Sequence, residues 1–107
     1  MKKILEGFAG EGILVGPYYI YIANVVLGHG KQKRGQERVK LRIYYGEDRF
    51  STPLAEYTLY PYAPKVEFEG ITITLESIEF KFKARRTRPI ANLDIEASGM
   101  TINKKTQ

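Results

Sequence analysis

The sequence predicts an all-β domain, an antiparallel β-sandwich of seven to eight short strands, with a small closed Greek-key barrel as the alternative. Apolar and polar residues alternate with a period of two over most of the chain. Turn signals that contain Gly and Pro separate the alternating stretches. No stretch shows the i, i+3, i+4, i+7 spacing with caps that a helix of three turns needs.

The first two strands are expected at 11–15 and 18–27, on either side of the turn signal Gly16-Pro17. The second strand is rich in Tyr, Ile and Val, which are enriched in strands. Asp, Glu, Lys and Arg are absent from Gly12 to Gly30, a run close to the length of a membrane helix. Because Gly16-Pro17 interrupts this run and its residues favour strands, we expect no membrane span here.

The clearest alternation lies in the next expected strand, 37–45. Its apolar face carries Val39, Leu41, Ile43 and Tyr45, and its opposite face carries Arg38, Lys40 and Arg42. A further strand at 54–60 is bounded by Pro53 before it and by the segment from Pro61 to Pro64 after it.

Four more strands are expected at 65–69, 71–76, 78–85 and 90–97. The apolar positions change parity twice in this half of the chain, around Ser77 and again between Ile90 and Leu93. A one-residue change of parity moves side chains to the other face of a sheet, so around Ser77 we expect the chain to bulge, twist or turn.

Residues 1–99 are expected to form a single domain, and residues 100–107 a disordered tail. Cysteine is absent from the chain, which excludes disulfides and Cys-based zinc sites. Glu6 and Glu11 interrupt the apolar stretch that a signal peptide requires, so we expect a cytoplasmic protein. The predicted core consists of Val39, Leu41, Ile43, Ile71, Ile73, Leu75, Phe80, Phe82, Leu93 and Ile95.

Positive charge is concentrated in two segments, although the net charge of the chain is only +5. Eleven of the seventeen Lys and Arg residues fall in these segments, each of which carries +5, while the rest of the chain carries −5. The basic residues of the first segment, opposed only by Glu37, are Lys31, Lys33, Arg34, Arg38, Lys40 and Arg42. Those of the second are Lys81, Lys83, Arg85, Arg86 and Arg88.

Such rows of cations on strands predict a surface that binds a polyanion, nucleic acid above all. Alternate residues of a strand lie about 7 Å apart, comparable to the spacing of phosphates along a nucleic acid strand. The segment from Lys31 to Arg38 would extend the surface from a Gly-rich hairpin loop. Exposed aromatic rings could stack on bases, and the candidates are Tyr44, Tyr60 and Tyr62.

No catalytic signature accompanies this charge, and we expect no enzyme activity, cofactor or metal site. The sequence Gly28-His29-Gly30-Lys31 lacks both the earlier Gly and the following Ser or Thr of a phosphate-binding loop. His29 is the only histidine, so neither a His-based metal site nor a His-containing triad can be built in the usual way.

Other classes of function remain open. Outward Lys and Arg also keep sheets soluble and protect their edges from pairing. A structural or assembly protein could associate with copies of itself or with a partner through the segments Tyr18–Ile22 and Tyr57–Tyr62. A third alternative is a sandwich that binds a small molecule or a carbohydrate. Whether the two basic strands are neighbours in one sheet decides between one basic surface and two.

Overall fold

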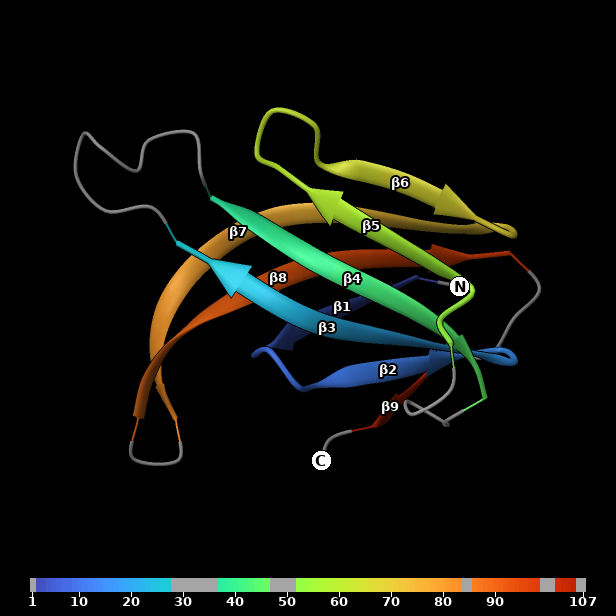
Figure 1. The fold of residues 1–107 in the computed structure, drawn as a ribbon, viewed down its shortest axis with the longest axis horizontal. Helices are drawn as coiled ribbons and strands as arrows, with labels where there is room; N and C mark the ends of the chain where they lie inside the picture. The colour runs from blue at the N-terminus through green and yellow to red at the C-terminus, as the bar shows by residue number, and fades with distance from the viewer. Residues whose placement is uncertain (1, 28–36, 47–51, 84–85, 99–101, 106–107) are drawn as a thin grey trace.

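The computed structural model describes the backbone of residues 2–27, 37–46, 52–83, 86–98 and 102–105, and the side chains of these residues except 2, 80–83, 86 and 102–105. The described residues form nine strands and no helix (Figure 1). The strands are β1 (Lys2–Gly7), β2 (Gly12–Val15), β3 (Tyr18–Val26), β4 (Arg38–Tyr45), β5 (Ala55–Leu59), β6 (Lys65–Phe68), β7 (Ile71–Lys83), β8 (Arg86–Ala97) and β9 (Ile102–Lys105).

The strands form two antiparallel sheets, which confirms the predicted β-sandwich. One sheet has the order β1-β8-β7-β6 and the other the order β5-β4-β3-β2-β9. The closed barrel is wrong, because the two sheets stay separate and each ends in edge strands. No helix in the described part of the chain is long and apolar enough to cross a membrane.

The parity change at Ser77 is a bulge inside one long strand. The expected strands 71–76 and 78–85 are both parts of β7, whose pairing with β8 shifts register between Leu75 and Ser77. The shift lets Leu75 and Ile78, which differ in parity, both pack on the same core.

The second parity change has a different cause, because β8 contains no register shift near Ile90. Its pairing with β1 runs without interruption from Lys2↔Glu96 to Gly7↔Ala91. Ala91 belongs to the core, so alternation places Ile90 on the opposite face of the sheet, where it is nevertheless buried. No bulge in β8 therefore separates Ile90 from Leu93.

Two strands lie outside the predicted set. β1 pairs with β8, and β9 pairs with β2 over residues where the sequence predicted a disordered tail. Both are edge strands of four to six residues, and neither carries a run of alternating apolar residues. Backbone pairing with a distant strand forms them, and a local pattern does not report such pairing.

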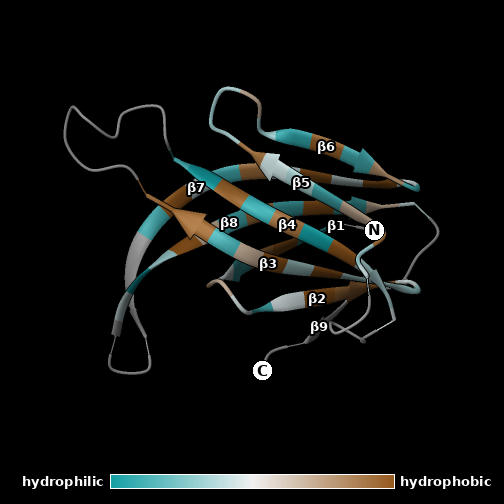
Figure 2. Cartoon of the chain, viewed as in Figure 1, coloured by the Kyte–Doolittle hydropathy of each residue, from teal (hydrophilic) through white to brown (hydrophobic). Residues whose placement is uncertain are grey.

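The core lies between the two sheets, and Figure 2 shows hydrophobic residues alternating with hydrophilic ones along β4. Eight of the ten predicted core residues are buried, which confirms their facing: Val39, Leu41, Ile43, Ile71, Ile73, Leu75, Leu93 and Ile95. The other two predictions, Phe80 and Phe82, fall on side chains outside the described set. Leu5, Ile13, Val15, Ile20, Ile22 and Leu59 complete much of the remaining core.

Candidate polyanion-binding surfaces

The two basic segments belong to different sheets. β4, with the first set of cations, is in the five-stranded sheet, and β7 and β8, with the second set, are in the four-stranded sheet. The cations therefore form two separate surfaces and do not merge into one patch. Lys31, Lys33, Arg34 and Arg85 lie outside the described residues.

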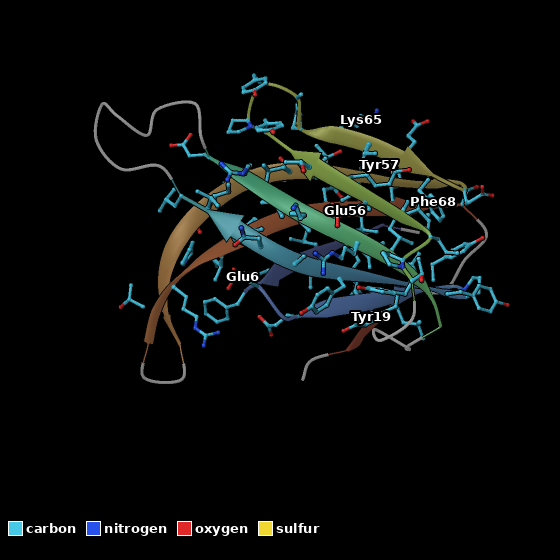
Figure 3. All side chains as sticks on the ribbon, in the orientation of Figure 1. Glu6, Tyr19, Glu56, Tyr57, Lys65 and Phe68 are labelled. Carbon is cyan, nitrogen blue, oxygen red and sulfur yellow. The ribbon has the colours of Figure 1, made fainter. Side chains whose placement is uncertain are left out.

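On the outer face of β4, a carboxylate offsets part of the positive charge. Arg42 donates its Nε–H to Oε2 of Glu56 at 2.8 Å, and Lys40 Nζ lies 3.8 Å from the other carboxylate oxygen. Arg42 and Glu56 are direct cross-strand partners, with Glu56 on β5 (Figure 3). The hydrogen bond from Arg42 lowers the pKa of Glu56 below its ordinary value and raises the pKa of Arg42. A polyanion at this surface has to compete with Glu56.

Tyr44 does not provide the exposed ring that the sequence predicted. It is only 3% exposed, although it lies on the outer face of β4. Its cross-strand partner is the buried Tyr19, and its ring packs against Tyr21 with the centroids 6.2 Å apart and the rings inclined at 68°. A base cannot stack on a ring that its neighbours already cover.

The absence of a side chain at Gly12 makes room for this tyrosine cluster. A Cβ at Gly12 would lie 2.7 Å from Tyr19 Cζ and 2.5 Å from the backbone oxygen of Ile20. The Tyr19 ring therefore lies close over β2. Glycine inside a strand often marks such a close approach, which is the one signal in the sequence that could have warned of this burial.

Tyr60 and Tyr62 do keep an aromatic surface, but two glutamates line the hollow beside it. Their rings stack with centroids 4.9 Å apart and an interplanar angle of 15°, and Tyr62 is 72% exposed. Tyr60 and Ala63 exchange two backbone hydrogen bonds around Pro61, which makes the turn rigid. The turn borders a hollow of about 200 Å³ that is lined by Leu27, Glu37, Pro61, Leu75, Glu76 and Ile78. The two glutamates disfavour phosphate beside this pair.

The second basic segment forms the end of a two-stranded ribbon. Pairing of β6 with β7 starts at Lys65↔Thr74, and pairing of β1 with β8 stops at Gly7↔Ala91. Beyond these points, residues 79–83 and 86–90 pair only with each other within the described chain. We call them the β7–β8 arm, and Figure 1 shows the two strands curving together away from the other strands.

The register of the arm places like charges opposite each other. Lys81 is the partner of Arg88, and Lys83 is the partner of Arg86. Directly opposed like charges destabilise a β-ladder, and cross-strand partners share one face of a sheet. The register therefore sets four basic residues opposite one another in two cross-strand pairs.

The single acid of the arm, Glu79, is bound toward the body of the sheet. Asn92 Nδ2 donates to Glu79 Oε2 at 3.2 Å and to Ser77 Oγ at 2.7 Å. Asn92 is the cross-strand partner of Ser77, two pairs before Glu79↔Ile90, the first pair of the arm.

The rest of this outer face is acidic. Alternation puts Arg88 on the same face as Asp94 and Glu96 of β8, and Glu6 of β1 and Glu67 of β6 lie on that face as well. Lys65 on β6 is the one exposed cation among the described side chains of this face outside the arm. Charge therefore changes sign along β7 and β8, from an acidic body to a basic arm.

Arg88 is the arm cation whose side chain is described. It is exposed, and its Cζ lies 5.6 Å from the centroid of the Phe8 ring, within cation–π range. Phe8 is buried in the turn between β1 and β2, where its backbone N–H donates to Glu11 Oε1 at 2.7 Å. A fixed ring thus lies under the guanidinium of Arg88, which belongs to the middle pair of the arm. Sequence reasoning missed Phe8, since nothing local links two residues eighty positions apart.

The described residues hold no group of three or more His, Cys, Asp or Glu side chains arranged for a metal ion. Comparisons of the chain with models of protein families, with curated proteins and with solved structures found no significant match.

Proposed function

We propose that this protein is a non-enzymatic binding module for a polyanion, nucleic acid in particular, and that the β7–β8 arm is its main contact surface. The observation that supports this best is the pair of like-charge partners Lys81↔Arg88 and Lys83↔Arg86. Repulsion between these partners weakens the pairing of the two strands of the arm. A bound polyanion removes the repulsion, because its phosphates lie between and over the cations.

Solubility alone is a weaker reason for the charge of the arm. Mixed charges keep a sheet face soluble without cross-strand repulsion, as Arg42 and Glu56 do on the other sheet. Protection of a sheet edge is a competing reason, since residues 79–83 and 86–90 pair only with each other in the described chain and each leaves an unpaired edge.

The β4 surface contributes less in this proposal. Glu56 interacts with both Lys40 and Arg42, so one carboxylate has to be displaced before phosphates reach these two cations. Tyr62 is exposed, but stacking of a nucleic acid base on its ring is disfavoured, because glutamates that repel phosphate line the adjoining hollow.

The assembly alternative has lost part of its expected surface. Within the segment Tyr18–Ile22, the side chains of Tyr19, Ile20 and Ile22 are buried inside the protomer. Tyr62 remains as the strongly exposed ring of the second segment. Self-association is therefore the second candidate and serves as an outcome of the test.

The test measures binding of labelled nucleic acid, single-stranded and double-stranded, by fluorescence anisotropy at several salt concentrations. Each phosphate contact contributes about 0.7 to 0.9 to the slope of log affinity against log salt concentration. The double variant Lys81→Ser/Lys83→Ser should flatten that slope by about 1.4 to 1.8. The control is Lys65→Ser, which removes an exposed cation from β6, away from the arm (Figure 3), and should leave the slope unchanged.

Two outcomes would contradict the proposal. The first is no binding by the unmodified protein at micromolar concentration and about 50 mM salt, where non-specific binders are normally detected. The second is an equal effect of Lys65→Ser and the double variant. A stable oligomer by size-exclusion mass, indifferent to added nucleic acid, would then favour assembly.

A further inference from the structure

We infer that β6, an edge strand of the four-stranded sheet, pairs with β6 of a second copy of this protein and so joins two such sheets into one. The inference is independent of the proposed function and concerns a different part of the molecule. Three observations support it: the direction of the backbone groups of β6, the charges on its outer face, and the apolar side chains left partly exposed beside it.

The first observation concerns the hydrogen-bonding groups of β6. This strand is the last of its sheet, and among the described residues it pairs with β7 alone (Figure 1). Leu75 N–H donates to the carbonyl oxygen of Pro64 at 2.8 Å, just before the strand begins. The register of β6 and β7 continues to this point, so the two residues are direct partners joined by a hydrogen bond.

Alternation from Pro64 determines which residues of β6 bond to β7. Directly opposed residues of an antiparallel pair alternate between those that exchange hydrogen bonds and those that do not. Val66 and Phe68 therefore bond to β7. The N–H and C=O groups of Lys65 and Glu67 point the other way, toward the open edge of the sheet. An edge strand with such outward groups is a template for another strand.

The turn after β6 holds this arrangement in place. Phe68 and Ile71 are direct partners, so Glu69 and Gly70 form a two-residue hairpin turn. Their φ angles are 49° and 81°, and a type I′ turn has positive φ at both positions. Turn type and loop length fix the register of a hairpin, so the outward groups of β6 are already in position before a partner arrives.

The second observation concerns charge, which matches β6 to itself. Lys65 and Glu67 are exposed on the outer face and lie opposite the uncharged Thr74 and Thr72 of β7. Two antiparallel β6 strands centred on Val66 place Lys65 of each copy opposite Glu67 of the other. The same two residues carry the outward backbone groups, so each Lys65–Glu67 pair also exchanges both of its hydrogen bonds.

The neighbouring registers are less favourable. A pair of strands centred on Lys65 sets the two lysines opposite each other, and a pair centred on Glu67 does the same with the two glutamates. Like charges that are directly opposed destabilise a β-ladder, whereas opposite charges stabilise it. Charged residues normally protect a sheet edge from pairing, but on β6 their order favours self-pairing in one register.

The third observation is an apolar strip beside this edge. Tyr57 of β5 and Phe68 of β6 (Figure 3), together with Val66, pack against the core but remain partly exposed. A second β6 brings its own Val66 next to this one on the inner face and covers part of the strip. Ala63 exchanges two backbone hydrogen bonds with Tyr60, which ends the free edge on one side. The contact is therefore short, and we expect a weak, reversible dimer.

Sedimentation equilibrium of the unmodified protein, at concentrations from about 10 μM to 1 mM, measures this association. We expect a dimer with a dissociation constant of about 0.1 mM, in keeping with a small transient interface. A protein that stays monomeric up to about 1 mM would overturn the inference and leave the proposed function intact. At the low micromolar concentrations of the nucleic acid assay the protein is monomeric, so Lys65→Ser is a valid control there.

Charge reversal tests the register. In Lys65→Glu and in Glu67→Lys, both charge pairs of the dimer become repulsive, so each variant alone should dimerise at least about tenfold more weakly. An equimolar mixture of the two variants should form a heterodimer with the affinity of the unmodified protein, because both pairs are attractive again. The double variant Lys65→Glu/Glu67→Lys should recover for the same reason. Failure of both to recover would overturn the register centred on Val66.

A backbone variant separates strand pairing from charge. Glu67→Pro removes an N–H that points away from β7, and edge strands tolerate proline at such a position. Glu67→Gln is the matched control, because it removes the same charge and keeps the N–H. We expect Glu67→Pro to dimerise about tenfold more weakly than Glu67→Gln. Equal affinities would overturn pairing through the backbone. Thermal melting followed by circular dichroism verifies the fold of every variant, and the charge-reversal mixture tests the inference even if Glu67→Pro does not fold.

Discussion

Reversing one charge of the arm, Lys81→Glu, should stabilise the arm while weakening polyanion binding. In the structure, Lys81 is opposite Arg88, so the substitution turns a repulsive cross-strand pair into an attractive one. Like and opposite charges in such pairs each change stability by about 0.2 to 1 kcal/mol, so the combined change is about 0.4 to 2 kcal/mol. At about 1.4 kcal/mol for each factor of ten, opening of the arm becomes about 2- to 30-fold rarer.

Native-state amide hydrogen exchange of residues 79–83 and 86–90 measures this change directly. Exchange of the arm amides should slow in Lys81→Glu at low salt, and most of the difference should disappear near 1 M salt, where charges are screened beyond about 3 Å. Lys65→Glu is the matched control, because its cross-strand partner is the uncharged Thr74. Unchanged or faster exchange in Lys81→Glu at low salt would refute the reasoning that the basic pairs repel each other across the arm.

Two further predictions concern the five-stranded sheet. Glu56→Gln should steepen the salt dependence of nucleic acid binding, because Arg42 loses its competing carboxylate. Because Arg42 lowers the pKa of Glu56, the ion pair stabilises the fold at neutral pH and is lost as the pH falls below about 4.5. The unfolding free energies of the wild type and Glu56→Gln should therefore converge in acid. A difference that stays constant with pH would contradict this. Gly12→Ala should lower the unfolding free energy, measured by urea denaturation, by about 1 to 3 kcal/mol, because the new Cβ would lie 2.5 Å from the backbone oxygen of Ile20. A decrease under about 0.5 kcal/mol would show that β2 moves freely to make room for it.

Much of the fold follows from alternation within short segments. Val39, Leu41 and Ile43 lie in the core because residues two apart share a face of a strand. The same rule located the bulge near Ser77, where the apolar positions change parity. Alternation does not account for Ile90, which is buried although it lies on the face opposite to the core residue Ala91. Parity alone does not report burial on an outer face.

The candidate site was only partly predictable. The sequence identified the cations of the arm, but their significance depends on register, since Lys81 and Arg88 become opposed only when β7 and β8 pair. The neutralising contact of Glu56 with Arg42 and the support of Arg88 by Phe8 join segments that are distant in the chain. The burial of Tyr44 likewise needs the neighbours that β3 brings to it.

By itself, the sequence determined the all-β class, the inward and outward faces of most strands, and the clustering of positive charge. Tertiary structure alone decided which strands are neighbours, that the two basic segments lie in different sheets, and that one of them ends in an unaccompanied two-stranded arm. The physical reason is that side-chain alternation is a local property of the backbone, with a period of two residues. Strand pairing is made by backbone groups that every residue carries, so its partners depend on how the whole core packs.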